Sequence, residues 1–319
     1  GTLNTGIGVC ALMKNTTGAN NTSVGHQTLL CNTTGCRNTA VGIGALIANT
    51  TGIENVAIGR NTLDANTTGN DNTSIGNSSL TANTTGTNNV AVGKDSLSQN
   101  TTGVCNVSIG QSNLFANSTG ACNTSMGTRS MQCNTTGARN SAFGLCALFN
   151  NTTANNNVAV GSGAGLNITT GGGQTLVGTN AGCNITTGTN NQVFGDIAGT
   201  DAVRNLTTSC SNNIVIGNNS NTNAYIKIDW TVTSDLRDKT EIKNVVHGLD
   251  FVNQITPIEY RFKKSREDDT PTGYKKYGFK AQEILELEGD NPVIINNEDK
   301  ENLKLTGAYL VPVLVNAIK

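Results

Sequence analysis

A 17-residue repeat covers most of the first two thirds of the chain and limits what the chain can fold into. Nine consecutive units begin with Asn15 and share the consensus N-T-T-G-x-x-N-[TV]-[SA]-[VI]-G-x-x-x-L-x-x, with small departures. Position 7 is always Asn, position 10 is always apolar, and position 11 is always Gly. After Gly161 the period loosens, and Ile214 to Gly217 resemble one last unit. A short fixed period is typical of solenoids, in which each unit forms one rung.

The repeat predicts short strands rather than helices. Gly and Asn at fixed places oppose a helix, as do β-branched residues, and the apolar positions do not follow a 3.6-residue period. The stretch N-[TV]-[SA]-[VI]-G is typical of a strand, and T-T-G and G-x-x are typical of tight turns. A single rung cannot bury its own Val at position 10 and Leu at position 15, so we expect rungs stacked at the spacing of paired strands, about 4.8 Å. Stacking would place the invariant Asn side chains in ladders along the axis.

One Val and one Leu for every 17 residues make a thin core. This deficit favours several chains around one axis, so we predict a mainly β fold with a homotrimeric β-solenoid, or β-helix, shaft. The repeat motif also resembles the head repeats of trimeric autotransporter adhesins, whose period is shorter. Asn4 and Gly8 fall at positions 7 and 11 of an earlier unit, which makes Gly1 the fourth residue of a truncated repeat. We therefore expect the chain to be a fragment of a longer protein.

Charge divides the chain in two. Residues 1–223 hold 13 of the 43 charged residues, and residues 224–319 hold the other 30. We predict a shaft over residues 1–223, a linker over 224–233, and a second domain over 234–319. Near-zero net charge on each part argues against a nucleic-acid partner. There is no apolar run of about 18 residues, so no membrane insertion is expected.

The shaft contains residue types that could form sites, but their spacing follows the fold. N-T-T and N-T-S match glycosylation acceptors, and because they recur with the period we interpret them as stacked Asn residues. The Gly171–Gly173 run has no following Lys and is interpreted as a turn rather than a phosphate loop.

Cysteines and carboxylates of the shaft give no sign of a metal or catalytic site. The nine Cys lack C-x-x-C pairs, so neither a disulfide framework nor a zinc site is indicated, and no metal or cofactor is expected. Recurrence in phase suggests small apolar fillers in a reducing cytosol, with a Cys105–Cys122 bridge across rungs as the less favoured alternative. A glycan-cleaving site needs paired carboxylates. The shaft carboxylates show no obvious shared site; they are Glu54, Asp64, Asp71, Asp95, Asp196 and Asp201.

Three motifs follow in order in the charged part: S-D-L-R-D-K at Ser234–Lys239, P-I-E-Y-R-F-K at Pro257–Lys263, and G-F-K-A-Q-E at Gly278–Glu283. A helix-like run closes the chain at Tyr309–Lys319. Together they resemble the endosialidase-type C-terminal intramolecular chaperone domain, a family of self-cleaving serine peptidases. The family occurs at the ends of phage tail spikes, tail fibres and neck appendages, in fibre-like proteins of other viruses, and in myelin regulatory factors. The resemblance implies a small α+β chaperone domain with a C-terminal helix.

This chain departs from the family pattern in two places. The family commonly has an apolar residue where Asp238 stands, which bears on the rate of cleavage. Its closing helix usually runs further than Lys319, so we expect truncation at this end as well.

The same resemblance implies a cleavage site. It assigns Ser234 as nucleophile, Lys239 as base, and the bond between Thr233 and Ser234 as the one broken. A Ser hydroxyl needs a neighbour that removes its proton, and Lys can do so only where desolvation lowers its pKa. We hypothesise that burial at a trimer interface supplies that desolvation. The alternative is that Ser234 and Asp235 merely cap a helix while Lys239 stays solvated.

Two further features of this domain are interpreted without a catalytic role. His247 has no evident partner and is expected in a loop or at a helix end. Glu267–Asp269, beside several cationic residues, is expected at a solvated hairpin tip.

These patterns predict a structural viral fibre or spike subunit. Identical rungs specify the register between chains poorly. A folded C-terminal domain that trimerises first would fix that register and then release itself by a single self-cleavage. We expect virion localisation after assembly in the host cytoplasm, self-association as the main partnership, and any host-surface receptor site outside this chain. The alternative is a cellular surface adhesin or membrane-tethered regulator matured by the same self-cleaving domain.

Overall fold

The computed structural model describes residues 1–200, 205–221, 225, 234–263, 266–290, 292–298 and 300–319. The chain divides into two compact units, Gly1–Asn219 and Ser220–Lys319. The predicted shaft end at residue 223 and most of the predicted linker 224–233 lie outside the described residues.

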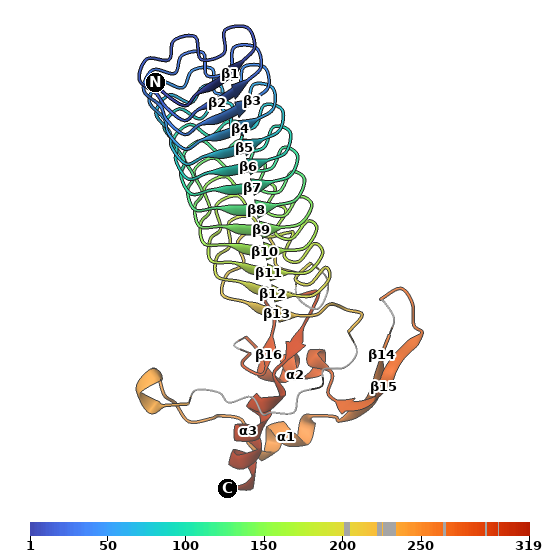
Figure 1. The fold of residues 1–319 in the computed structure, drawn as a ribbon. Helices are drawn as coiled ribbons and strands as arrows, with labels where there is room; N and C mark the ends of the chain where they lie inside the picture. Colours follow the sequence, from blue (N-terminus) through green and yellow to red (C-terminus); the bar gives the residue numbers. More distant parts are fainter. Residues whose placement is uncertain (201–204, 222–224, 226–233, 264–265, 291, 299) are drawn as a thin grey trace. The chain divides into compact units, whose positions relative to one another are not determined.

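The first unit is a β-solenoid, as predicted (Figure 1). Its 13 strands form one sheet in strict sequence order, with each strand parallel to the next and in register, as in the pairing of Thr73 with Val90. Each strand covers repeat positions 8 to 10. The strands are β1 (Thr5–Ile7), β2 (Thr22–Val24), β3 (Thr39–Val41), β4 (Val56–Ile58), β5 (Thr73–Ile75), β6 (Val90–Val92), β7 (Val107–Ile109), β8 (Thr124–Met126), β9 (Ser141–Phe143), β10 (Val158–Val160), β11 (Thr175–Val177), β12 (Gln192–Phe194) and β13 (Ile214–Ile216).

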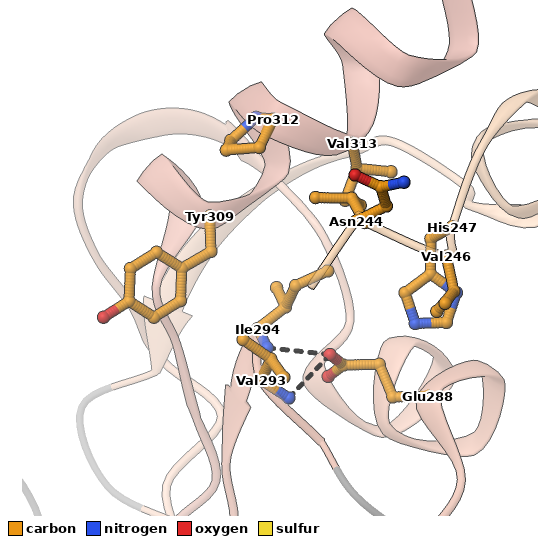
Figure 2. Close-up of a pocket in the computed structure, with 10 residues that line it drawn as sticks. Asn244, Val246, His247, Glu288, Val293, Ile294, Tyr309, Pro312 and Val313 are labelled. Carbon is orange, nitrogen blue, oxygen red and sulfur yellow. Dashed lines mark hydrogen bonds between the residues drawn. The ribbon is translucent and has the colours of Figure 1, made fainter. Parts of the chain in front are cut away.

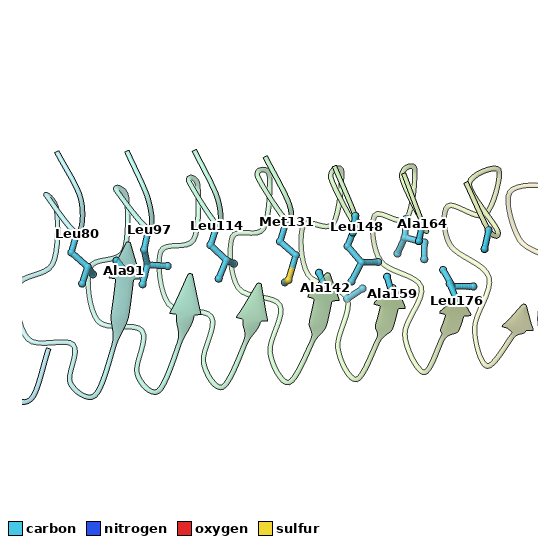
Figure 3. Close-up of a cluster of buried hydrophobic side chains, with 14 of the residues drawn as sticks. Leu80, Ala91, Leu97, Leu114, Met131, Ala142, Leu148, Ala159, Ala164 and Leu176 are labelled. Carbon is cyan, nitrogen blue, oxygen red and sulfur yellow. The ribbon is translucent and has the colours of Figure 1, made fainter. Parts of the chain in front are cut away.

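The core of each rung is built from small residues and one Leu. Position 15 supplies a fully buried column that runs from Leu29 through Leu97 to Leu148, with Met131 in its place in one rung (Figure 3). The middle strand residue, Ala or Ser in most rungs, faces this column, as at Ala91. The expectation that position 10 shares the core is wrong: Ile75, for example, is 38% exposed. Strand side chains alternate between faces, and the face that meets the Leu column is the one that carries position 9.

Two predicted Asn ladders hold the rungs together. In the position 7 ladder, Asn72 donates its side-chain amide to Asn55 Oδ1 at 3.1 Å and to the Gly86 carbonyl oxygen at 2.9 Å. In the position 1 ladder, Asn83 donates to Asn66 Oδ1 at 2.9 Å. These four Asn residues are almost completely buried, so the hydrogen bonds satisfy polar groups that water cannot reach.

The second unit is a small α+β region with a C-terminal helix, as predicted. Its helical segments are η1 (Leu236–Asp238), α1 (Leu249–Gln254), α2 (Ala281–Glu288), η2 (Gly307–Tyr309) and α3 (Leu310–Ile318). Antiparallel pairing joins β14 (Ile258–Lys263) to β15 (Pro271–Gly278), and β16 (Ile295–Asn296) to β17 (Lys304–Leu305). The buried core consists of Phe251, Ile284, Ile294, Ile295, Leu310 and Val313. Among the described helices, none has the length and apolar character needed to span a membrane.

Candidate functional site

A single 3₁₀ turn, η1, organises the first motif of the second unit. Asp235 precedes the turn and caps it, since its side chain accepts a hydrogen bond from the Arg237 backbone NH at 2.9 Å. The Arg237 guanidinium donates two hydrogen bonds to the same carboxylate, from Nη2 to Oδ2 at 2.6 Å and from Nε to Oδ1 at 3.0 Å. These contacts lower the pKa of Asp235, chiefly through the Arg237 side chain. Asp235 therefore stays ionised and keeps the turn closed at neutral pH.

The turn brings Lys239 back to Ser234. The backbone NH of Lys239 donates to the Leu236 carbonyl oxygen at 3.2 Å. Its Nζ then lies 2.7 Å from Ser234 Oγ and 3.1 Å from the Ser234 carbonyl oxygen. Both side chains are exposed. Asp235 alone caps the turn, whereas the Ser234 side chain contacts Lys239. The capping alternative therefore describes Asp235 but not Ser234.

This arrangement has the parts that nucleophilic catalysis needs: a hydroxyl and an amine within hydrogen-bond distance. The assignment of Ser234 as nucleophile and Lys239 as base stays a prediction. The predicted cleavage partner Thr233 lies outside the described residues.

A protein-family comparison bears on this segment. The model of a peptidase family described as chaperone of endosialidase matches residues 234–291, and the match begins at Ser234 itself. The second unit carries a chaperone-of-endosialidase domain. The family implies a self-cleaving peptidase domain, and the domain together with the β-solenoid shaft fits a phage tail-fibre-like protein. Comparison with curated proteins found no match, and comparison with solved structures found none either.

The other motifs of the chaperone domain form regular elements. P-I-E-Y-R-F-K supplies β14, in which Tyr260 and Phe262 meet edge to face with ring centroids 5.3 Å apart. G-F-K-A-Q-E leads into α2. The hairpin between β14 and β15 carries Asp269, which forms an ion pair with Lys263, so the charged run lies at a hairpin tip as predicted.

The chaperone domain also holds a pocket of about 320 Å³ lined mainly by apolar side chains (Figure 2). Glu288 lies at its edge, where its carboxylate accepts the backbone NH groups of Val293 at 2.8 Å and Ile294 at 2.7 Å. His247 is in the loop before α1, as predicted, and stacks on Phe251 with ring centroids 4.2 Å apart. The Glu288 carboxylate is thus engaged by backbone donors, and Val and Ile side chains make up much of the lining.

Cysteines of the shaft are free thiols, and Cys210 packs against the core. All nine belong to the described residues, and each is half-buried or exposed rather than buried. Cys105 and Cys122 lie on consecutive rungs and are both exposed. Among the described residues, no group of three or more His, Cys, Asp or Glu side chains could hold a metal ion.

One pair of interacting carboxyl side chains in the shaft was not predicted from the sequence. Glu54 and Asp71 both occupy position 6, on consecutive rungs, and interact side chain to side chain, with Arg37 on the rung before. Arg37 lies 2.6 Å from Glu54 and lowers the pKa of Glu54, whereas the hydrogen bond with Glu54 raises the pKa of Asp71. Their shared repeat position was the signal in the sequence. These exposed side chains form a surface charge column rather than a buried acid–base pair.

Proposed function

We propose that this chain is a viral tail-fibre-like or spike subunit whose C-terminal domain assembles three chains in register and then releases itself between Thr233 and Ser234. The observation that carries the proposal is the 2.7 Å contact between Lys239 Nζ and Ser234 Oγ, at the first residue of the chaperone-of-endosialidase match.

The proposed reaction is a single self-cleavage. Ser234 Oγ attacks the carbonyl carbon of Thr233, and Lys239 Nζ takes the hydroxyl proton. The Thr233–Ser234 C–N bond then breaks as Lys239 returns that proton to the departing Ser234 nitrogen, which leaves an ester on Ser234 Oγ. Water hydrolyses the ester, restores the hydroxyl, and leaves a carboxylate on Thr233. The step needs no cofactor and no external substrate.

Lys239 can act as base only when its amine is neutral. An ordinary Lys amine is neutral in about one molecule in 2,500 at pH 7. Lys239 is exposed in the single chain, so we propose that a neighbouring copy covers it in the trimer and that the loss of water favours the neutral amine. Cleavage would then follow correct assembly and would not precede it.

A shaft of this kind needs an external source of register. Through the regular rungs, the Asn ladder contacts recur with equivalent partners 17 residues apart, so these rungs are alike. A copy displaced by a whole rung would therefore present nearly the same surface to its neighbours, and non-local strand pairing is slow. A domain that folds and trimerises first would align the chains, and its release would leave a kinetically stable fibre. We propose that the fibre is assembled in the host cytoplasm, becomes part of the virion, and meets any host-surface receptor through regions outside this chain.

Gel analysis of the purified chain tests the cleavage. The wild type should yield a C-terminal piece of 86 residues, 234–319, whereas Ser234→Ala and Lys239→Ala should stay intact. Lys243→Ala is the matched control, because Lys243 is an exposed Lys of the same domain, and it should cleave normally. If the wild type never yields the piece, the dyad is wrongly assigned.

Expression of the shaft alone tests the chaperone role. Residues 1–233 without the domain should aggregate, and the full chain should give soluble trimers. Soluble, homogeneous trimers formed by the shaft alone would contradict this role.

A further inference from the structure

A continuous row of apolar side chains runs along the outside of the shaft. In each strand the middle residue faces the core, and the third residue, repeat position 10, points outward. Ile58, Ile75 and Ile109 are 39%, 38% and 36% exposed. We call the 13 third residues the apolar row; they are Ile7, Val24, Val41, Ile58, Ile75, Val92, Ile109, Met126, Phe143, Val160, Val177, Phe194 and Ile216. A solvated sheet face would carry polar residues at these positions.

The rest of this sheet face carries no charge. The first residue of each strand also points outward and is Thr or Val in 10 of the 13 strands. The other three first residues are Ser141, Gln192 and Ile214, which are also uncharged. Charged side chains of the shaft lie at other repeat positions, such as the Arg37–Glu54 pair at position 6 and Lys94 at position 12. The face is therefore uncharged along its whole length, which lets copies approach without like-charge repulsion.

The size of the row fits an interface. A large apolar side chain that is more than a third exposed presents roughly 60 Å². Nine of the 13 row members are that exposed, and Val24, Val41, Val92 and Phe194 are half-buried. The row thus presents on the order of 700 Å², close to what each partner loses in a stable interface of standard size. It exceeds the largest apolar patch of a typical monomer, about 300–600 Å². A patch of this size on a soluble shaft indicates a binding surface.

The periodicity of the row identifies its occupant. Apolar side chains recur along the axis at the spacing of paired strands, about 4.8 Å, and a partner that covers them all must repeat at the same spacing over the same length. The chain itself offers such a surface. We propose that the apolar row is the seam along which copies of this chain pack in parallel. The assignment rests on the proposed trimer and adds which face of each rung meets the other copies.

The row also contributes to register. Met126 and Phe143 interrupt a series that is otherwise almost entirely Ile and Val. When three copies pack in register, Met126 of each copy meets Met126 of the others, and Phe143 likewise meets Phe143. A slip of one rung would place Phe143 against the smaller Val160 and leave a packing mismatch. The seam would then retain the register that the chaperone domain sets, after that domain has gone.

Lysine placed in the row tests the seam. The double variant Ile75→Lys/Ile109→Lys, made in the full chain, should give a cleaved shaft with the mass of one chain in size-exclusion chromatography with light scattering, where the wild type gives three. Asn77→Lys/Gln111→Lys is the matched control: it adds the same charge in the same rungs at position 12, which tolerates Lys94 in another rung. Both control positions are exposed, and this variant should remain trimeric. A trimeric row variant would overturn the proposal.

A photocrosslink keeps the test valid if lysine disturbs folding. Replacing Phe143 by photoreactive p-benzoylphenylalanine preserves an aromatic side chain, and illumination should join two copies into a band of doubled mass on a denaturing gel. The same replacement at Leu145, which is exposed in the same rung at position 12, should give far less of this band. Equal crosslinking at both positions, or none at Phe143, would overturn the seam. The 86-residue piece on the same gel reports cleavage independently, so failure of the seam is distinguishable from failure of self-cleavage.

Discussion

The side-chain oxygen of Asn55 accepts two hydrogen bonds from Asn72 on the next rung, one from the backbone NH at 3.0 Å and one from the side-chain amide at 3.1 Å. The same Asn72 amide donates to the Gly86 carbonyl oxygen at 2.9 Å. Both Asn side chains are buried. Asn72 Oδ1 in turn accepts from the Asn89 amide at 3.1 Å, so each amide acts as donor and acceptor at once, as Gln174 does at the same repeat position.

We expect Asn72→Asp to destabilise the shaft by about 3 kcal/mol or more. A carboxylate cannot donate to Asn55 or to Gly86, and it would be a buried charge beside two unpaired acceptors. Asn77→Ala, in the same rung at an exposed position, should change stability by less than about 0.5 kcal/mol. Urea denaturation followed by circular dichroism measures both, and equal effects would contradict the role given to the ladder.

Gly76 stands where the backbones of two rungs approach closely. It has φ of 133°, and a Cβ added there would lie 2.5 Å from the Gly93 carbonyl oxygen. Gly76→Ala should therefore cost about 3 kcal/mol or more and force the rungs apart. The matched control is Gly173→Asn, since Asn156 and Asn190 hold the same repeat position at φ of 60° and 57°. We expect that variant to be neutral in the same denaturation experiment.

The period of the sequence predicted the solenoid and its ladders, because a fixed repeat leaves stacked rungs as the only way to bury each Leu. It did not predict which strand face would be inside. A strand has two faces because its side chains alternate, and the face that packs inside is the one that meets the Leu column. The position of that column depends on the turn that carries Leu80, which is fully buried with φ of 51°. A Leu in left-handed conformation costs of order 1 kcal/mol or more. Local propensity alone would not place one there, and stacked neighbours on both sides enforce it.

At the candidate site, the motif predicted the residues but not how they are held. The S-D-x-R-x-K pattern gave Ser234 and Lys239, and the alternative interpretation included a cap by Asp235. The ion pair of Asp235 with Arg237 depends on a turn that sequence spacing does not define. The proposed protection of Lys239 from water could not be read from one chain, because the proposal assigns it to a neighbouring copy.

Two shaft thiols should react slowly with alkylating reagents at neutral pH. Burial raises the pKa of Cys133 and of Cys183, and the thiolate is the reactive form. Their alkylation by iodoacetamide, followed residue by residue with mass spectrometry, should therefore require a higher pH than alkylation of the exposed Cys105. In urea the three rates should converge. Alkylation of Cys183 as fast as Cys105 in the folded chain at pH 7 would contradict the burial.

Loss of the Asp235 cap should slow cleavage and leave the chemistry intact. Asp235→Ala removes the acceptor that closes the turn and frees Arg237, so Lys239 would reach Ser234 in a smaller fraction of molecules. We expect cleavage on the order of tenfold slower than in the wild type, with the same products. Complete loss of cleavage would mean that Asp235 takes part in the reaction, and an unchanged rate would mean that the turn does not position Lys239.

The pH dependence of the cleavage rate distinguishes two roles for Asp235: positioning Lys239 through the turn, and exchanging a proton during cleavage. Because Arg237 lowers the pKa of Asp235, the contribution of this ion pair to the turn is present above the ordinary Asp pKa and is lost only as the pH falls through the lowered value. Between about pH 5 and 9 Asp235 does not titrate. The shape of the rate profile should therefore be the same in the wild type and in Asp235→Asn, even if Asp235→Asn is slower throughout. Arg237→Ala should raise the pKa of Asp235 towards its ordinary value, measured by carboxyl NMR titration. A change in the shape of the profile for Asp235→Asn within that pH range would show that Asp235 exchanges a proton during cleavage.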